Sequence, residues 1–520
     1  MSSQPNNLSQ KASLLILAAI CLAALILPLS FSAGAVATPI IGRQLGGSTT
    51  SLIWITNAFM LAFGSSLMAA GALADAYGRK RLFATGVGAF ALLSLMLAAA
   101  PSVFWIDVLR ALQGLAAAAA LSGGSAALAQ VFEGQARTRA FSMLGTSFGT
   151  GLAFGPLLAG FLIEHWGWRS IFLFIAIVAI AALLFGVPRM HESRDPQASG
   201  LDLPGAATFT MTLVLLTSGI VEATDHRWNS ALVLSLLIAS AIFSALFVIV
   251  ERRVKRPMLD LALFRYPRFI GVQVLPIGTC YCYIVLLVLL PLRFIGVNGL
   301  SEIDAGILML ALSAPMLVVP SLASWLTRWL SPGVLSGTGL LIAAAGLYLL
   351  GRVGIRETGS ALVLPMLMIG CGTGLPWGLM DGLSVSVVPK DRAGMATGIF
   401  STTRVAGEGI ALAIVTVVLA ALTQSRLSQL LTDENARAGA SICEASASLS
   451  SGNLAHAVLQ LPGISRAIMV TQYGEAFKTL LHLLVAITLI SSLVVFALLA
   501  KPGRSGAIVE SGATLVSTSD

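Results

Sequence analysis

The chain has 520 residues, a formal net charge of +8 at pH 7, 57% hydrophobic residues and only 10% charged residues. A soluble globular protein carries about 25% charged residues, so this chain cannot cover its surface in water. The composition excludes a soluble fold, a disordered chain, a coiled coil and a disulfide-stapled secreted domain, and it indicates a protein that crosses a membrane many times.

Fourteen apolar runs are long enough to cross about 30 Å of hydrocarbon as helices. In chain order they are 13–37, 52–74, 82–100, 104–129, 140–163, 169–188, 203–223, 230–250, 269–293, 305–327, 333–351, 359–387, 396–423 and 475–500. None has the short alternating pattern of a β-barrel strand, so we expect an all-α polytopic membrane protein. A cleaved signal peptide is the alternative for the first run, because Lys11 precedes it and 35–37 resembles a cleavage site.

The basic residues predict the orientation of the chain. If the fourteen helices alternate, most of the 31 Lys and Arg residues fall in loops on the side of the N-terminus. Cytoplasmic loops carry the excess of positive charge, so we expect both termini in the cytoplasm and a multi-pass protein of a bacterial-type inner (plasma) membrane. The net charge is then a topology signal, and no nucleic-acid partner is expected.

Enzymatic chemistry has no visible support in the sequence. No loop is large enough for a soluble catalytic domain, no Walker-type glycine-rich sequence occurs, and the five His residues form no metal-binding pattern. We therefore expect no enzyme, no metal and no cofactor beyond a proton gradient. The remaining chemistry is the movement of a solute, with a membrane enzyme or sensor on the same fold as a third hypothesis.

The segment after 52–74 combines glycines with a charge cluster: Gly71, Asp75, Gly78, Arg79, Lys80 and Arg81. Glycines let helix ends and a tight turn approach closely, and Asp75 can pair with basic groups or cap a helix. Such a cluster can latch two helix bundles in one conformation; a basic topology anchor is the alternative. Its spacing resembles the signature loop between helices two and three of the major facilitator superfamily.

Two further patterns resemble motifs of that family. Arg110 with Gln113 in 104–129 resembles its second motif, and an intramembrane Arg faces a polar cavity or a partner, unless it extends outward to the membrane surface. The small residues of 140–163 resemble the antiporter motif of drug-exporting members: Gly151, Gly155, Pro156 and Gly160. The resemblance implies that this helix seals against the other half of the protein; ordinary small-residue packing is the alternative.

The resemblance extends along nearly the whole chain and is greatest to the fourteen-helix drug:proton antiporter branch of the superfamily. It implies two six-helix bundles with two extra central helices. The expected division is a cytoplasmic N-terminus 1–12, an N-terminal bundle 13–194, two linker helices in 195–256, a C-terminal bundle 257–500 and a cytoplasmic tail 501–520. The outer loop 424–474 is expected to form an amphipathic helix or hairpin on the membrane surface, or a linker.

The charged residues inside the predicted helices depart from this branch. Helix one of the branch commonly carries an acidic residue where Ser30 stands, and 13–37 contains no Asp or Glu. The intramembrane acids are instead Asp381 and Glu408. Glu408 lies one turn beyond Arg404, so we expect the two to pair, either as a static ion pair or as the proton carrier. Asp381 follows 370–382, where we expect a broken helix; a cytoplasm-facing structural contact is the alternative.

Several side chains are candidates to line a substrate cavity: Trp54, Phe59, Phe63, Gln113, Phe154, Trp377 and Met380. Aromatic and Met side chains in membrane helices more often serve packing or lipid contact, which is the alternative for them. The predicted function is a secondary active, proton-coupled exporter of drug-like or lipophilic compounds that works by alternating access as a monomer. A dedicated transporter of one neutral or anionic metabolite is the alternative, favoured by Arg110, Arg404 and the missing acid.

Overall fold

A computed structural model describes residues 10–132, 134–194, 202–223, 230–254, 261–355, 357, 359–387, 393–430 and 436–500. Within these residues, fourteen helices are long and apolar enough to cross a membrane, and their positions match the fourteen predicted runs. The expected all-α polytopic fold is confirmed. The boundaries expected near 195, 256 and 501 fall at or beside residues outside the described ranges.

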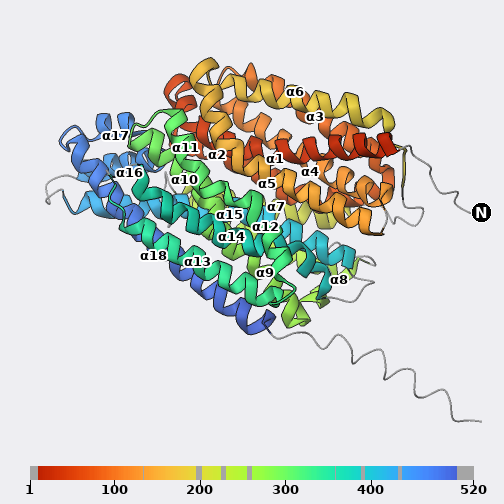
Figure 1. Ribbon diagram of the computed structural model, residues 1–520. Coiled ribbons are helices and arrows are strands. Elements are labelled where there is room, and N and C mark those ends of the chain that lie inside the picture. The colour runs from red at the N-terminus through yellow and green to blue at the C-terminus, as the bar shows by residue number, and fades with distance from the viewer. Residues whose placement is uncertain are drawn as a thin grey trace, which may run out of the picture.

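The N-terminal half is a bundle of six long helices (Figure 1). They are α1 (Gln10–Leu45), α2 (Thr49–Tyr77), α3 (Arg79–Ala98), α4 (Val103–Val131), α5 (Gly134–Trp166) and α6 (Arg169–Gly186), followed by the short η1 (Val187–Arg189). Small residues allow their close packing. At Gly86 and Gly114 a Cβ atom would collide with the backbone of the neighbouring helix, which is how membrane helices pack tightly without a hydrophobic driving force between them.

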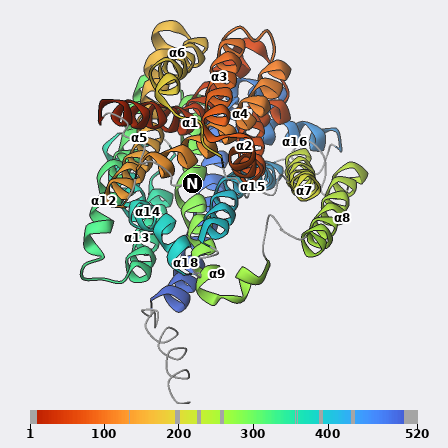
Figure 2. The ribbon, with the colours of Figure 1, turned by 90° about the vertical axis from the view of Figure 1, so that its right-hand side faces the viewer.

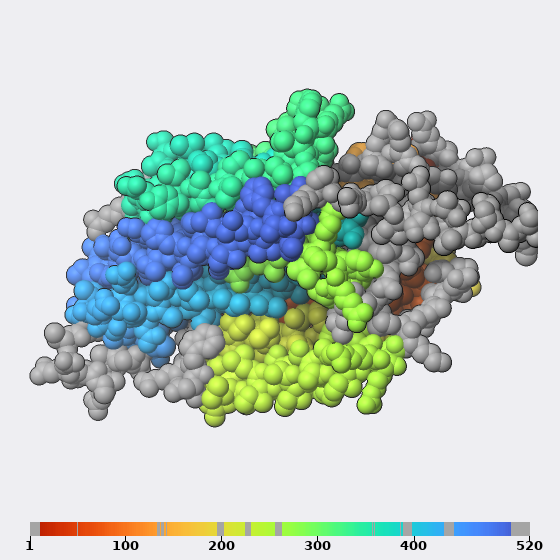
Figure 3. Space-filling view, turned by 90° about the horizontal axis from the view of Figure 1, so that it is seen from below, coloured from red at the N-terminus to blue at the C-terminus, as the bar shows by residue number. Residues whose placement is uncertain are grey.

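The next two helices, α7 (Leu203–Glu222) and α8 (Ala231–Arg253), pack against each other beside the bundles. Figure 2 shows them flanking α2 and α15, and α7 contacts both of those helices. The outer face of α8 exposes Leu234, Ile238 and Ile242, and Figure 3 shows α8 as one lateral edge of the molecule. An apolar face of this kind suits contact with lipid tails.

The C-terminal half begins with one irregular span and continues with five more. The first span joins α9 (Pro267–Thr279), η3 (Cys280–Ile284), α10 (Val285–Pro291) and η4 (Leu292–Val297), after the short η2 (Leu261–Arg265). The others are α11 (Glu302–Ser313) with α12 (Pro315–Leu326), α13 (Pro332–Arg352), α14 (Ser360–Ser386), α15 (Ala393–Ser428) and α18 (Arg466–Leu499). The segments η3 and η4 are π-helical, a form that is rare and frequent at functional sites.

The predicted break within 370–382 is wrong, because α14 runs through that stretch without interruption. Its glycines serve close packing instead: at Gly370 and Gly378 a Cβ atom would meet the backbone of Leu312 and Pro320. The interruption lies at Ala314, between α11 and α12.

The segment expected to be a long outer loop is shorter and largely helical. It contains α16 (Ala436–Ser450) and α17 (Leu454–Gln460). Residues 445–452 are buried, against α15 and η4. The structure therefore has helices here rather than a linker, and the second half of α16 lies inside the protein rather than on a membrane surface.

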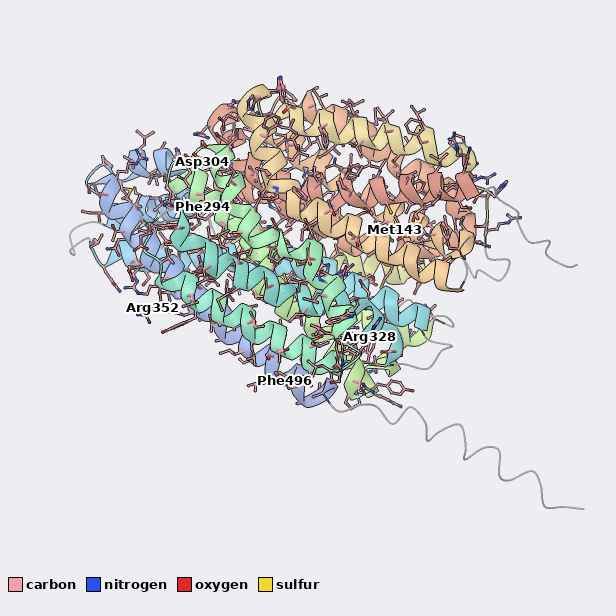
Figure 4. The ribbon with its side chains drawn as sticks, in the orientation of Figure 1. Met143, Phe294, Asp304, Arg328, Arg352 and Phe496 are labelled. Carbon is pink, nitrogen blue, oxygen red and sulfur yellow. The ribbon has the colours of Figure 1, made fainter. Side chains whose placement is uncertain are left out.

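The beginning of α1 and the end of α18 lie at the same end of the helix bundle (Figure 1), which we call the terminal end. The opposite end, which we call the distal end, carries α16 and α17 (Figure 1). In Figure 4, Asp304 and Arg352 lie toward the distal end and Arg328 lies toward the terminal end. Successive spans therefore alternate in direction, as the fourteen predicted runs require.

Candidate functional site

A central pocket of about 290 Å³ lies where the two halves meet. Its lining is aliphatic and aromatic, with a single carboxyl group: Leu27, Pro28, Phe31, Phe59, Met60, Phe63, Phe148, Leu152, Ile284, Trp377 and Glu408. Eight of these residues come from α1, α2 and α5, and three come from the C-terminal half. A mostly apolar pocket with one precisely placed polar group is typical of sites that bind small organic molecules.

Glu408 is the charged residue of this lining. It lies on α15 and only 9% of its surface is exposed. Within the described part of the chain, no ion pair joins it to a basic side chain. A carboxylate in an apolar setting is costly unless it binds a proton or a cation, so this pocket can attract either one.

The expected pair between Arg404 and Glu408 is wrong, because Arg404 pairs with a different acid. Its Nη1 lies 3.3 Å from Oδ1 of Asp381 on α14. The guanidinium lies 5.6 Å from the ring centre of Phe400 and 5.8 Å from that of Trp377. Helical side chains lean toward the N-terminus of their helix, so Arg404 reaches back toward Phe400 and away from Glu408.

The aromatic candidates separate into two groups. Phe59, Phe63 and Trp377 line the central pocket. Trp54 packs instead against a buried cluster from α7, α8 and α15 that includes Ile220 and Ala413.

The other candidates also lie outside the pocket lining. Phe154 is 41% exposed, and Met380 of α14 is fully buried but does not line the pocket. The lining residues that the sequence did not single out, such as Phe31, Phe148 and Ile284, look like any other apolar residue of a membrane helix.

Arg110 is fully buried in the core of the N-terminal half rather than in the pocket. Its Nε donates to the carbonyl oxygen of Ile55 at 3.0 Å, and its Nη1 donates to Ser30 Oγ and to Gln113 Oε1, both at 2.8 Å. Gln113 extends this hydrogen-bond network to α3, because its Nε2 donates to Ser94 Oγ at 2.8 Å. Arg110 therefore ties four helices together, and Gln113 belongs to this network and not to a substrate cavity.

The cluster after α2 is built entirely within the N-terminal half. Asp75 Oδ1 lies 2.9 Å from Nη2 of Arg79, which also donates to Gln130 of α4. Gly78 has a φ of +121°, a conformation that favours glycine and lets α3 begin directly after α2.

The basic end of the cluster, with Lys80, is held by the segment after α6. The carboxylate of Glu192 accepts hydrogen bonds from the backbone N–H groups of Lys80 and Arg81 at the start of α3, at 3.2 and 3.1 Å. Glu192 also lies 3.6 Å from Nε of Arg81. In this conformation a Cβ atom added at Gly71 would meet no described atom of another segment within 4 Å, so the first glycine of the cluster borders open space.

The glycines of α5 bring it against both halves. A Cβ atom at Gly151 or Gly155 would collide with α1, and one at Gly160 would collide with the carbonyl oxygen of Glu302 on α11. Beside Pro156, Ser313 Oγ donates to the carbonyl oxygen of Ala153 at 2.6 Å. Close contact between α5 and α11 thus joins the halves through backbone atoms.

Along α5 the two halves meet at the distal end and separate toward the terminal end, whereas beside α2 they stay in contact, because Met68 packs against the buried cluster that contains Phe269 and Ile399. At the distal end, Arg43 pairs with Glu302 at 3.3 Å across the halves. Along α5, contacts with the other half run from Gly160 to Gly149, whereas a Cβ atom added at Gly145 would meet no described atom within 4 Å. Gly398 of α15 likewise borders open space. The central pocket is therefore closed from the distal side.

Residues 20–412 match the model of the protein family described as "Major Facilitator Superfamily". The chain is 32% identical to the "Multidrug resistance protein Stp" of Mycobacterium tuberculosis (strain CDC 1551 / Oshkosh), covering 75% of this chain and 73% of the relative. It is 33% identical to the "Puromycin resistance protein pur8" of Streptomyces alboniger, covering 76% and 79%. Its fold is similar to the crystal structure of a bacterial homolog of the human lysosomal transporter Spinster, with a TM-score of 0.59, 15% identity and coverage of 94% and 97%.

Proposed function

The chain belongs to the major facilitator superfamily, and from that premise we propose that it is a secondary transporter that exports drug-like, lipophilic or cationic compounds. Its relatives named for multidrug and puromycin resistance support this substrate class. The observation that carries the proposal is the central pocket, which sits between the halves, is lined by aromatic and aliphatic side chains, and holds one carboxyl group.

Transport in this proposal is alternating access. The chain lies in a bacterial plasma membrane with both termini in the cytoplasm, so the structure described above is open to the cytoplasm and closed to the outside. A lipophilic cation enters between the halves, stacks against Phe59 and Trp377, and faces Glu408. The halves then rock about the pocket and release it outside.

Glu408 couples this movement to protons. A single buried carboxylate can hold either a proton or a cationic substrate, because both neutralise the same charge. In the outward-open state a proton from outside binds the carboxylate and displaces the substrate. In the inward-open state the proton leaves to the cytoplasm and the next substrate takes its place. One chain and no cofactor are sufficient for this cycle.

The positions of the basic residues disfavour a dedicated carrier of an organic anion. Arg110 is enclosed in the N-terminal core, and Arg404 is neutralised by Asp381. The charge that faces the central pocket is negative, so an anion would meet a carboxylate with no basic partner there.

The test uses inverted membrane vesicles with an acidic interior and a clamped membrane potential. Tetraphenylphosphonium, a lipophilic cation, should accumulate with the pH gradient in the wild type. Glu408→Gln keeps the shape of the side chain and removes the exchangeable proton, so accumulation should be lost while downhill movement remains. Glu475→Gln, which changes an exposed carboxylate on α18, is the matched control.

Two results would overturn the proposal. If the wild type moves neither tetraphenylphosphonium nor puromycin, the export function is wrong. If Glu408→Gln still concentrates the cation with an unchanged response to the pH gradient, export stands and the coupling role of Glu408 is wrong.

A further inference from the structure

A second pocket of about 340 Å³ lies directly distal to the central one. The two share helices, one turn apart: Ile284 lines the central pocket and Val288 the second, and Glu408 lines the central pocket and Leu412 the second. On α2, Phe59 lines the central pocket and Asn57, which lies nearer the distal end, lines the second pocket. A substrate that leaves the central pocket toward the distal end therefore reaches this second pocket next.

The second pocket has a different chemistry. Its lining carries hydroxyl and amide groups from both halves and no charged side chain among the described residues: Thr38, Thr56, Asn57, Thr416, Ser450 and Ser451. Several of the hydroxyls are already used as donors within their own helices. Thr38 donates to Gly34 and Thr416 donates to Leu412. These hydroxyls keep free lone pairs facing the pocket and can accept hydrogen bonds.

Asn57 is the exception in this lining. It is fully buried, and neither its amide nitrogen nor its amide oxygen has a hydrogen-bond partner among the residues that the structure describes. Leaving a buried donor or acceptor unsatisfied costs about 1–3 kcal/mol, so a buried amide normally has partners. An amide that lines a pocket with both atoms free is prepared to bind a group that both donates and accepts.

The distal wall of this pocket comes from the end of α16. Ser450 and Ser451 line it, and the following Gly452 packs against the backbone of Gly296 in η4 so closely that a Cβ atom at Gly296 has no room. The buried segment 445–452 thus closes the second pocket from outside in this conformation. Access from the distal side requires this contact to open.

We propose that the second pocket is a substrate subsite on the exit path, which binds neutral hydrogen-bonding groups, such as hydroxyls and amides, through Asn57. The proposal rests on the proposed export function. It divides recognition between two levels: the central pocket takes the apolar and cationic part of a compound, and the outer subsite takes its polar part. Selectivity among compounds of equal lipophilicity then depends on the outer subsite.

The experiment compares two probes in one set of variants. Puromycin carries hydroxyl and amide groups together with a cationic amine, whereas tetraphenylphosphonium has a charge and no hydrogen-bonding group. Asn57→Leu keeps the number and branching of the side-chain heavy atoms and removes the amide. The ratio of the half-saturating concentrations for puromycin and tetraphenylphosphonium should rise by about fivefold to tenfold, the equivalent of one lost hydrogen bond.

Gln273→Leu is the matched control. Gln273 is also a buried amide with both atoms unpartnered, but it lies on α9 outside both pockets. This variant should leave the ratio unchanged. If Asn57→Leu yields no folded protein, Thr416→Val tests the same wall from the C-terminal half, and it should raise the ratio in the same direction.

The outcomes separate the two proposals. A ratio unchanged in both Asn57→Leu and Thr416→Val means that the pocket holds ordered water only, and it overturns the subsite while tetraphenylphosphonium export stands. An equal change of the ratio in Gln273→Leu shows a general effect of buried amides and also overturns the subsite. If the wild type transports neither probe, the proposed function fails first.

Discussion

The hydroxyl of Ser30 accepts a hydrogen bond from Nη1 of Arg110 at 2.8 Å, at the position where the resembling transporters commonly carry an acid. Among the described residues, the hydrogen-bond acceptors of this guanidinium are Ser30, Gln113 and the carbonyl of Ile55, all neutral. An Arg guanidinium stays protonated, and a hydroxyl, an amide and a peptide carbonyl are not acids, so this network exchanges no proton. The carboxyl that faces the pocket is Glu408, in the other half.

Replacing Ser30 by Ala should destabilise the protein. A hydrogen bond to a charged group contributes about 1.5–3 kcal/mol, and Arg110 cannot reach water to replace it. Thermal unfolding in detergent should show a clear drop for Ser30→Ala. Ser65→Ala is the control, because that hydroxyl donates only within its own helix. Equal drops in the two variants would contradict the role of Ser30.

Asp75→Asn should slow transport strongly and leave substrate affinity near normal. In this structure Asp75 pairs with Arg79, and the partners that the structure describes for the cluster lie in the N-terminal half. A latch across the halves would therefore form in another conformation of the proposed transport cycle. Asn keeps the shape and removes the charge. Transport rates in vesicles and binding to the purified protein measure the two effects separately. Loss of affinity at a preserved rate would show that Asp75 belongs to the binding site.

Asp381→Asn should retain accumulation driven by the pH gradient. The side chain of Asp381 is 62% exposed, pairs with Arg404 and does not line the central pocket. The carboxylate of the pair reaches solvent although Arg404 is mostly buried, and an ion pair of this kind contributes about 1 kcal/mol, so transport should change by less than about fivefold. The variant is assayed beside Glu408→Gln. Loss of the pH response in Asp381→Asn alone would transfer the coupling role to Asp381.

A larger residue at Gly160 should loosen the distal closure. A Val side chain there collides with the backbone of Glu302, whereas Gly145→Val, on the same helix, enters open space and serves as the control. In a background without Cys443, a Ser450→Cys reporter should then react faster with an impermeant thiol reagent in Gly160→Val than in Gly145→Val. Equal reaction rates would mean that the contact between α5 and α11 does not hold the distal end closed.

The proposed orientation has a direct test in intact cells. Cys443 lies on α16 at the distal end and is partly exposed, whereas Arg81 lies at the terminal end with its side chain 78% exposed. An impermeant maleimide should label Cys443 in the native chain. In a background without Cys443, it should not label Arg81→Cys. The reverse pattern would invert the orientation.

The helices could be predicted from sequence because a membrane imposes a simple requirement, a run of apolar residues about 30 Å long. The ion pairs could not be predicted from sequence, because the spacing of residues along one helix indicates only neighbours on that helix. Arg404 and Glu408 are one turn apart, yet Asp381 from α14 provides the partner. The break at Ala314 and the buried end of α16 likewise depend on contacts between segments distant in sequence.

The pocket lining was the hardest feature to predict. Phe59 and Trp377 were recognised as candidates, but Phe31 and Phe148 have the same chemistry as side chains that face lipid. In a soluble protein an apolar residue usually indicates the core, whereas a membrane helix has apolar residues on all of its faces, including those that contact lipid. Only the packing of the two halves distinguishes the residues that meet a substrate.

At the middle of the protein, Gly64 of α2 sits so close to Ala406 of α15 that a Cβ atom would lie 2.5 Å from the backbone nitrogen. This contact joins the halves between their closed and open ends and involves no long side chain that would have to disengage. In the proposed alternating-access cycle this contact would be the pivot, about which a small tilt of the halves closes one end of the pocket and opens the other. The energy barrier of the proposed cycle then depends on this contact between two backbones, which can change its angle without breaking side-chain interactions.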